Sequence, residues 1–200
     1  MIKYFFSFLE KIALISLIFI FTILMLYLPA FASTKAGLTK NIEIETKDKI
    51  MIEGIIELPK SATTKNKAPL VIMLHSIGGN KEIYNPFVEE LRKRGIASVR
   101  IDLRGHGQSI GNSVNSKKTY WQQYSSKTFK KYPDDILTVL NFVKENFQQV
   151  NTNKTAIIAA DISANASIIA ANNKIKTLVL ISPCLDYQGL KTPIKLVNYG

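Results

Sequence analysis

Short apolar runs that alternate with amphipathic helical stretches are the feature of this sequence that most limits its possible folds. Four runs have the length of a buried strand: 70–74, 96–101, 155–159 and 178–181. Three stretches between them carry apolar side chains at helical spacing: 83–94, 133–147 and 162–171. Strands that alternate with helices form βαβ units. We therefore predict an α/β fold with a mostly parallel central sheet and flanking helices.

Local signals predict how the helices begin and end. The helix over residues 83–94 is expected to end at Gly95 and to bury one apolar stripe: Ile83, Phe87, Val88 and Leu91. Pro133 and the two aspartates after it suit the first turn of the helix over residues 133–147.

The remaining segments differ in how much regular structure they are expected to contain. Residues 42–45 and 50–58 alternate or cluster apolar side chains, which predicts a hairpin that opens the domain. Residues 105–132 are rich in Gly, Ser, Asn, Lys and Tyr, and we expect them to form a loop with little regular structure.

The first 32 residues have the order of a secretory signal peptide. Two lysines flank a polar entry, residues 12–28 carry no charge, and Ala30-Phe31-Ala32 forms a cleavage site of the A-x-A type. The uncharged run is also almost long enough to span a membrane, so residues 12–28 could instead form an uncleaved anchor. We expect an exported protein, periplasmic or secreted, or one anchored by this segment, with its domain over residues 33–200.

Composition excludes several classes of function. The net charge is +11, but the lysines are scattered and form no basic stripe interleaved with aromatics, so we expect no nucleic-acid partner. Cys184 is the only cysteine, and an internal disulfide is therefore impossible. The sequence contains no phosphate-binding or dinucleotide motif and no clustered His and Cys residues. We predict no metal site and no cofactor.

Three motifs follow the predicted strands in a fixed order. They are LHSIGG at residues 74–79, RIDLRGHGQS at 100–109 and AIIAADISANA at 156–166. Together with SPCLDY at 182–187, they resemble the α/β-hydrolase family, and within it the dienelactone-hydrolase-like and esterase-like members. The resemblance covers roughly residues 42–190. It implies the α/β-hydrolase fold, hydrolysis of carboxylic esters and a small-molecule ester-like substrate.

The resemblance also assigns roles to the turns after the first two strands. Backbone N–H groups in such turns stabilise the oxyanion that develops during acyl transfer. The resemblance implies that Ile77 and Ile162 supply these donors, although Gly78 and Gly79 in the turn that begins at His75 could simply permit tight bending. For the second motif, the resemblance implies a turn that marks the fold and is formed by Asp102, Gly105, His106 and Gly107. In such a turn the histidine is a structural residue and does not act as the catalytic base.

The third motif departs from its family at the catalytic position. A nucleophile elbow has small residues two positions before and after the nucleophile, usually as G-x-S-x-G. Ala159 and Ser163 are small, which places Asp161 at the nucleophile position. The alternative register makes Ser163 the nucleophile, but its flanks, Asp161 and Asn165, are larger than the strained turn admits.

Three interpretations of Asp161 stay open at this point. Its carboxylate could attack a substrate carbon, as in the haloalkane dehalogenases and epoxide hydrolases of the same family. It could be the N-cap of the helix that begins at Ile162, where aspartate is favoured. A serine could also have been lost from a gene that is no longer selected for catalysis.

The remaining catalytic groups have no counterpart at the expected places. The family places its acid after the seventh strand and its histidine after the eighth, and no histidine follows Asp161 here. Asp186 is a possible acid, or a residue of the local turn. We therefore expect a degenerate or incomplete hydrolase that is inactive alone. The alternatives are a binding or assembly protein that a partner chain completes at the edge of strand 178–181, and one part of a split hydrolase.

Overall fold

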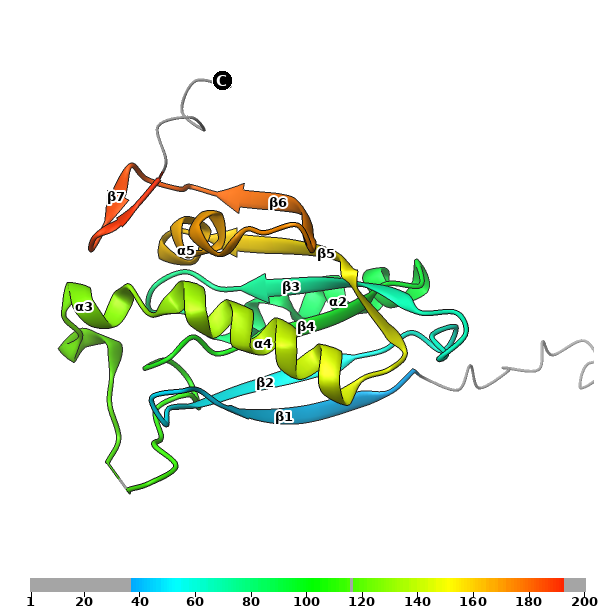
Figure 1. Ribbon diagram of the computed structural model, residues 1–200, viewed down its shortest axis with the longest axis horizontal. Coiled ribbons are helices and arrows are strands. Elements are labelled where there is room, and N and C mark those ends of the chain that lie inside the picture. The colour runs from blue at the N-terminus through cyan, green and yellow to red at the C-terminus, as the bar shows by residue number, and fades with distance from the viewer. Residues whose placement is uncertain (1–36, 116, 193–200) are drawn as a thin grey trace, which may run out of the picture. The chain divides into compact units, whose positions relative to one another are not determined.

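In the part of the chain that the structure describes, the central sheet has six strands in the order β1-β2-β4-β3-β5-β6 (Figure 1). Their bounds are β1 Thr39–Glu45, β2 Met51–Glu57, β3 Ala68–Leu74, β4 Ala97–Ile101, β5 Val150–Ala160 and β6 Ile175–Ile181. β1 and β2 are antiparallel, as are β2 and β4, whereas β4, β3, β5 and β6 run parallel. The predicted opening hairpin and the mostly parallel sheet are both confirmed.

This computed structural model describes residues 37–115 and 117–192. The predicted signal peptide or anchor, residues 1–32, lies outside the described residues. No helix within the described ranges is long and apolar enough to cross a membrane.

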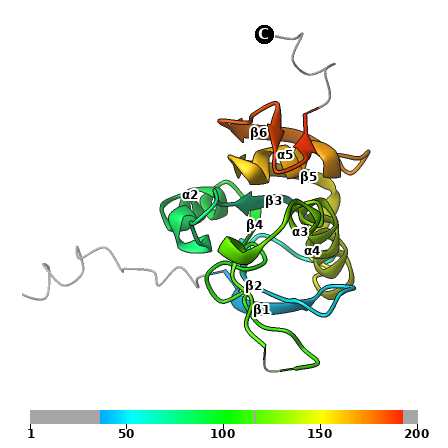
Figure 2. The same ribbon diagram turned by 90° about the vertical axis from the view of Figure 1, so that its left-hand side faces the viewer.

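Helices pack on both faces of the sheet. Their bounds are η1 Lys81–Tyr84, α2 Asn85–Lys93, η2 Trp121–Gln123, α3 Ser126–Phe129, α4 Tyr132–Asn146 and α5 Ile162–Ala170, where η denotes a 3-10 helix. Figure 2 shows α2 on one side of the sheet and α4 on the other. α5 packs against α4 and shares its core cluster. After β6, the short strands β7 (Asp186–Tyr187) and β8 (Leu190–Lys191) form a hairpin.

The larger core lies between the sheet and the helices α4 and α5. The central strands contribute Ile72, Ile101 and Ile157, and α4 contributes Ile136 and Val139, all of which are fully or almost fully buried. The continuous apolar run of β3 is explained by burial on both of its faces, as parallel strands require. On the side of α2 the core is much smaller, with Val71, Met73 and Tyr84 as its buried members.

The predicted stripe of α2 is wrong in two positions. Ile83 and Phe87 are 59% and 55% exposed. Residues 81–84 form a separate 3-10 turn. Tyr84 of this turn and Val88 and Leu91 of α2 pack on the side of β3 instead, at the spacing i, i+4 and i+7. Phe87 then lies about a quarter of a turn away from the sheet.

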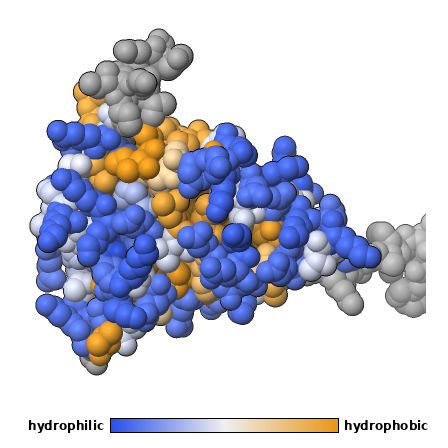
Figure 3. All heavy atoms as spheres, in the orientation of Figure 1, coloured by the Kyte–Doolittle hydropathy of each residue, from blue (hydrophilic) through white to orange (hydrophobic). Residues whose placement is uncertain are grey.

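The expectation for residues 105–132 needs a smaller correction. The segment contains η2 and α3, each a single turn. They form where Trp121 and Phe129 pack against neighbouring aromatic rings. In the view of Figure 3, apolar atoms gather in the part of the surface where Figure 1 places α5 and β6, and most of the remaining surface is hydrophilic.

Candidate active site at the carboxyl edge of the sheet

Asp161 lies at a sharp turn between β5 and α5. Its backbone angles are φ 57° and ψ −125°, a conformation that residues other than glycine rarely adopt. Ala159 and Ser163, the small residues on either side, are both fully buried. A side chain held in a strained turn between a strand and a helix is the geometry of a nucleophile elbow.

Ser163 does not occupy the position of a nucleophile. It lies inside α5 and is fully buried. Its Oγ lies 3.0 Å from the carbonyl oxygen of Leu74 and 2.8 Å from that of Ala160, and it accepts a hydrogen bond from the Ala160 N–H. The hydroxyl therefore links the elbow to the end of β3 by hydrogen bonds. The alternative register, with Ser163 as the nucleophile, is excluded.

The carboxylate of Asp161 points to the turn after β3. The N–H of Ile77 donates to Asp161 Oδ2 over 3.4 Å. The same N–H is the one that the family resemblance implies as an oxyanion donor. Ile162 begins α5, so its N–H has no acceptor within the helix. The elbow and the turn predicted to hold an oxyanion are therefore brought together, with the carboxylate of Asp161 hydrogen-bonded to one of the two predicted donors.

Asp161 occupies the N-cap position of α5, as one interpretation of the sequence held, but its side chain does not cap the helix. Its carboxylate forms no capping hydrogen bond with α5. The backbone oxygen of Asp161 accepts from the N–H groups of Ala164 and Asn165 instead. The positive φ of the elbow explains this outcome, because it turns the side chain away from the first turn of the helix and toward Ile77.

His75 closes the oxyanion turn and is fully buried. Its Nε2 accepts a hydrogen bond from the Leu103 N–H over 3.0 Å, and its Nδ1 lies 2.7 Å from the Ser76 oxygen. The ring is therefore neutral, with its proton on Nδ1. Burial lowers the pKa of His75 to about 4. Gly78 adopts a positive φ of 74°, which permits the tight bend in the turn.

The buried His75 makes stability depend on pH. The folded protein holds this ring neutral down to a pKa of about 4, whereas an unfolded chain protonates it near 6.5. The unfolded state therefore binds more protons between these values, and stability falls as the pH falls through them. We expect the free energy of unfolding, measured in urea, to drop by about 2 kcal/mol between pH 7 and pH 5 because of His75.

His75→Gln is the matched control for this prediction, since its amide oxygen can accept from Leu103 without titrating. The pKa of His106 is also lowered by burial, so a part of the pH dependence remains in the variant. An equal loss of stability in the wild type and in His75→Gln would contradict the assignment.

The second turn is built around a buried carboxylate. Asp102 accepts hydrogen bonds from the backbone N–H of Lys81, from Lys81 Nζ and from the Gln108 N–H, over 2.7, 2.7 and 2.9 Å. Gly105 and Gly107 both have positive φ, 77° and 48°. These contacts hold the chain back against the ends of β3 and β4.

His106 is part of this turn and does not reach Asp161. It is buried, and its Nδ1 donates to the Arg104 oxygen over 3.1 Å. Its ring stacks on Trp121 with the centroids 5.5 Å apart. Burial lowers the pKa of His106, which keeps the ring neutral. Within the described residues, Asp161 forms no hydrogen bond with either of the two histidines of the sequence.

Asp186 is the first residue of β7, next to the turn that joins β7 to β8. It is exposed, and its Oδ1 accepts from the Gly189 N–H over 2.7 Å. This contact supports the interpretation of Asp186 as a residue of the local turn, the alternative to a catalytic acid. The pKa of the phenol of Tyr187, beside it, is raised by burial and, to a smaller extent, by the negative charge of Asp161.

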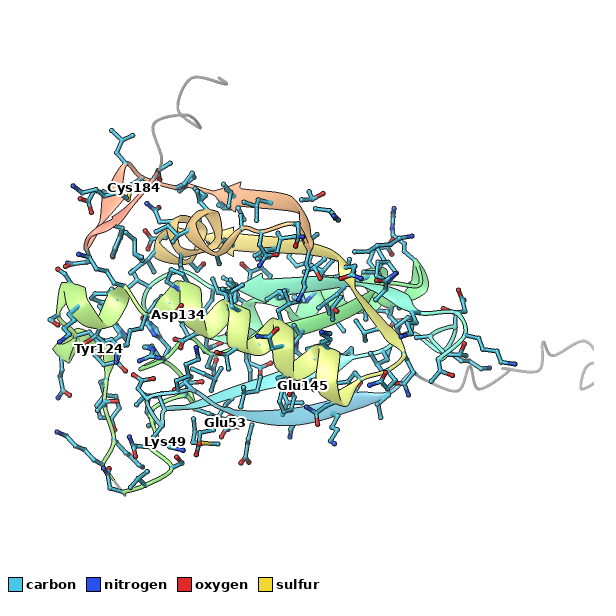
Figure 4. The ribbon with its side chains drawn as sticks, in the orientation of Figure 1. Lys49, Glu53, Tyr124, Asp134, Glu145 and Cys184 are labelled. Atoms are coloured by element: carbon cyan, nitrogen blue, oxygen red, sulfur yellow. The ribbon has the colours of Figure 1, made fainter. Side chains whose placement is uncertain are left out.

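Asn165 has a structural role that the sequence pattern did not indicate. Its Nδ2 donates to the oxygens of Cys184 and Leu190 over 2.7 and 2.9 Å, and its Oδ1 accepts from the Cys184 N–H over 3.0 Å. Cys184, labelled in Figure 4, lies between β6 and the β7–β8 hairpin. Asn165 thereby fastens the segment after β6 to α5. Its partners are 19 and 25 residues away, so no local motif marks it.

The strain at the elbow can be measured. Asp161→Ala keeps the unfavourable backbone angles, whereas Asp161→Gly relieves them. We expect Asp161→Gly to be more stable than Asp161→Ala by about 1 kcal/mol, because relief of the strain outweighs the greater entropy of unfolded glycine. Urea unfolding of both variants tests this. A glycine variant that is less stable than the alanine variant would mean that the elbow is unstrained.

The parallel sheet, the strained turn after β5 and the N–H donor after β3 together define an α/β hydrolase. Residues 65–198, more than half of the chain, match the sequence profile of the family described as serine aminopeptidase, S33. The chain therefore belongs to this family of α/β hydrolases.

Solved structures of esterases share the fold. An acetyl xylan esterase from a Paenibacillus species superposes with a TM-score of 0.59 at 18% identity, over 76% of this chain and 51% of that one. An esterase from Pyrococcus furiosus superposes with a TM-score of 0.55 at 18% identity, over 74% of this chain and 50% of that one. A carboxyl esterase from Bacillus coagulans superposes with a TM-score of 0.54 at 15% identity, over 71% of this chain and 43% of that one. The chain thus spans about half the length of these proteins. No curated protein matches the sequence.

Proposed function

We propose that this chain is an α/β hydrolase that does not turn over esters by itself. The observation that carries the proposal is the carboxylate of Asp161 at the elbow, bound to the Ile77 N–H. An anion in this position occupies a donor that the oxyanion of an ester intermediate needs. It would also repel that oxyanion, so the two cannot be stabilised together.

The histidines support the same proposal. Attack by a hydroxyl nucleophile requires a base that takes its proton, and hydrolysis of the ester formed on either a hydroxyl or a carboxylate requires a base that takes a proton from water. His75 has hydrogen-bond partners at both ring nitrogens, and His106 is buried against Trp121. Within the described residues, neither ring forms a hydrogen bond with Asp161.

Hydrolysis of p-nitrophenyl acetate and p-nitrophenyl butyrate by the full-length protein tests the proposal. The release of p-nitrophenol should equal the rate in buffer, and Asp161→Ala should leave it unchanged. Turnover above the buffer rate that disappears in Asp161→Ala would overturn the proposal, because it would show that the elbow is catalytic.

A second candidate function follows from the way in which Asp161 is held. Ile77 binds Oδ2, and within the described residues Oδ1 accepts no hydrogen bond. Oδ1 could attack the carbon of an alkyl halide: the O–C bond forms as the carbon–halogen bond breaks, and the halide leaves with the electron pair. Because neither histidine is hydrogen-bonded to Asp161 in the described part of the chain, we expect water not to be activated there and the alkyl ester to persist.

Intact-mass measurement separates this candidate from an inert site. After incubation with 1-bromobutane, the wild type should gain one butyl group, located at Asp161 by peptide mapping. Asp161→Asn, which keeps the size of the side chain, should gain none there. Absence of the adduct in the wild type would eliminate Asp161 as a nucleophile, and continuous bromide release would show that water does cleave the ester.

A further inference from the structure

Lysines that are scattered along the sequence come together at one edge of the sheet. Residues 59–69, 148–156 and 171–177 lead into β3, β5 and β6 and include the first residues of these strands. Neighbouring parallel strands begin at the same edge of a sheet, so the three segments lie side by side there (Figure 1). They carry six lysines, which we call the amino-edge lysines: Lys60, Lys65, Lys67, Lys154, Lys174 and Lys176.

The amino-edge lysines have no local countercharge. Their three segments contain no Asp and no Glu, and five of the six residues are exposed, whereas Lys174 is half-buried. None of the six forms an ion pair with another described residue. Lys176 Nζ donates to the backbone oxygen of Asn173, which is a neutral acceptor. The six charges therefore add to a positive potential over this edge.

The carboxyl edge, where Asp161 lies, has mixed charge instead. Lys49 forms an ion pair with Glu45, and Lys131 forms one with Asp48. Acidic and basic side chains therefore lie together at that edge, whereas the three segments of the amino edge carry one sign of charge. A partner with dense negative charge is complementary to the amino edge.

The chain also enters the described domain at the amino edge. The N–H of Leu58 donates to the oxygen of Leu38 over 2.8 Å, and Lys60 follows Leu58 by two residues. β1 begins beside this contact, at Thr39. The sequence before β1 contains the uncharged run of residues 12–28, which we expect to be a signal peptide or a membrane anchor. The part of the sequence with affinity for a bilayer is therefore joined to the amino edge of the sheet.

We propose that the amino-edge lysines bind the surface of a membrane that contains anionic lipids. Each lysine close to such a surface adds to the attraction, and lysine interacts with phosphate groups as a compact point charge. The three segments contain no arginine and no aromatic residue. Proteins that bind single-stranded nucleic acids usually stack bases on aromatic or arginine side chains. The composition of this edge therefore favours lipid phosphates over a nucleic acid.

Binding at the amino edge would leave the candidate active site open to solution. Asp161 follows Lys154 by seven residues along β5. At the rise of a parallel strand this separation is about 23 Å, with the two residues toward opposite ends of the strand. A soluble molecule would reach Asp161 from the side that faces away from the membrane. The proposal does not depend on whether Asp161 reacts.

Acetylation of individual lysines by N-acetoxysuccinimide, followed by peptide mass spectrometry, tests the proposal. The full-length protein is mixed with vesicles of phosphatidylcholine alone, or of phosphatidylcholine and phosphatidylglycerol in a two-to-one ratio. We expect the amino-edge lysines to react about threefold or more slowly on the anionic vesicles than on the neutral ones. Lys47, Lys117 and Lys127, which are exposed near the carboxyl edge, should keep their rates. Sodium chloride at about 0.5 M should abolish the difference.

Two double variants with the same net charge separate this edge from the charge of the whole protein. Lys65→Glu/Lys154→Glu should remove the protection of the other amino-edge lysines, whereas Lys47→Glu/Lys117→Glu should retain it. The neutral vesicles account for any binding through residues 12–28, because both kinds of vesicle have the same apolar interior.

Three results would overturn the proposal. The first is equal acetylation of the amino-edge lysines on anionic and neutral vesicles. The second is protection that extends equally to the lysines of the carboxyl edge, or that the two double variants lose alike, because net charge alone would then explain it. The third is loss of the protection when single-stranded DNA is added at an equal concentration of phosphate, because the partner would then be a nucleic acid.

Discussion

Gly107→Ala is expected to destabilise the protein by about 3 kcal/mol or more, because a methyl group has no room in the turn. A Cβ at this position would lie 2.3 Å from Oδ2 and Cγ of Asp102. Gly107 also has a φ of 48°, which strains any residue with a side chain. Asp102 cannot move aside, because three hydrogen bonds hold its carboxylate. Urea unfolding at neutral pH measures the loss.

Gly111→Ala is the control for this substitution. A Cβ at Gly111 meets no atom within 4 Å, and its φ is not positive. We expect its stability to stay within about 0.5 kcal/mol of the wild type. An equal loss of unfolding free energy in the two variants would show that the turn does not depend on the close approach of Gly107 to Asp102.

Lys81→Met should cost about 3–5 kcal/mol, the typical effect of leaving one member of a buried ion pair without its partner. Lys81 Nζ and Asp102 Oδ2 lie 2.7 Å apart, and both side chains are buried. Lys81 Nζ also donates to Gln108 Oε1, so the substitution removes two side-chain contacts. The free energy of unfolding measures the effect.

Lys49→Met supplies the comparison with an exposed pair. Lys49, labelled in Figure 4, follows β1 and forms an ion pair with Glu45 in which both side chains are about half exposed. Such pairs contribute about 0–1 kcal/mol. Similar losses in the two variants would contradict the distinct role of the buried pair.

Both large effects concern the position of the oxyanion turn. Lys81 begins η1 directly after the turn that contains Ile77, and its contact with Asp102 joins that turn to the end of β4. His75 makes a second connection through the Leu103 N–H. Ile77 is therefore held opposite Asp161 by buried polar contacts between β3 and β4, and loss of these contacts should disturb the site together with the fold.

The sheet and the elbow could be predicted because their signals are local. The apolar run of β3 is buried on both faces, and the run of β5 alternates between buried and half-buried positions. The small residues Ala159 and Ser163 place Asp161 in the turn. Which side chains of α2 face the sheet could not be predicted from local signals. It depends on a 3-10 turn at residues 81–84, which shifts the buried stripe to Tyr84, Val88 and Leu91.

The contacts that hold the site together depend on distant residues. Lys81 and Asp102 are 21 residues apart, and His75 and Leu103 are 28 apart. Lysine is rarely buried, so its sequence position alone indicates a surface residue. The role of Asp161 was also beyond a local pattern: aspartate before a helix usually caps it, and the positive φ of the elbow is what directs the carboxylate to Ile77.

Hydrolysis of p-nitrophenyl acetate by Asp161→Ser tests whether a base is available at the elbow. This substitution restores the residue usual at the elbow and removes the carboxylate from the Ile77 N–H. Because neither histidine can act as its base, we predict that Asp161→Ser, Asp161→Ala and the wild type all release p-nitrophenol at the buffer rate. Catalytic turnover that appears in Asp161→Ser and is absent from Asp161→Ala would show that a base is available at the elbow, and would contradict the account.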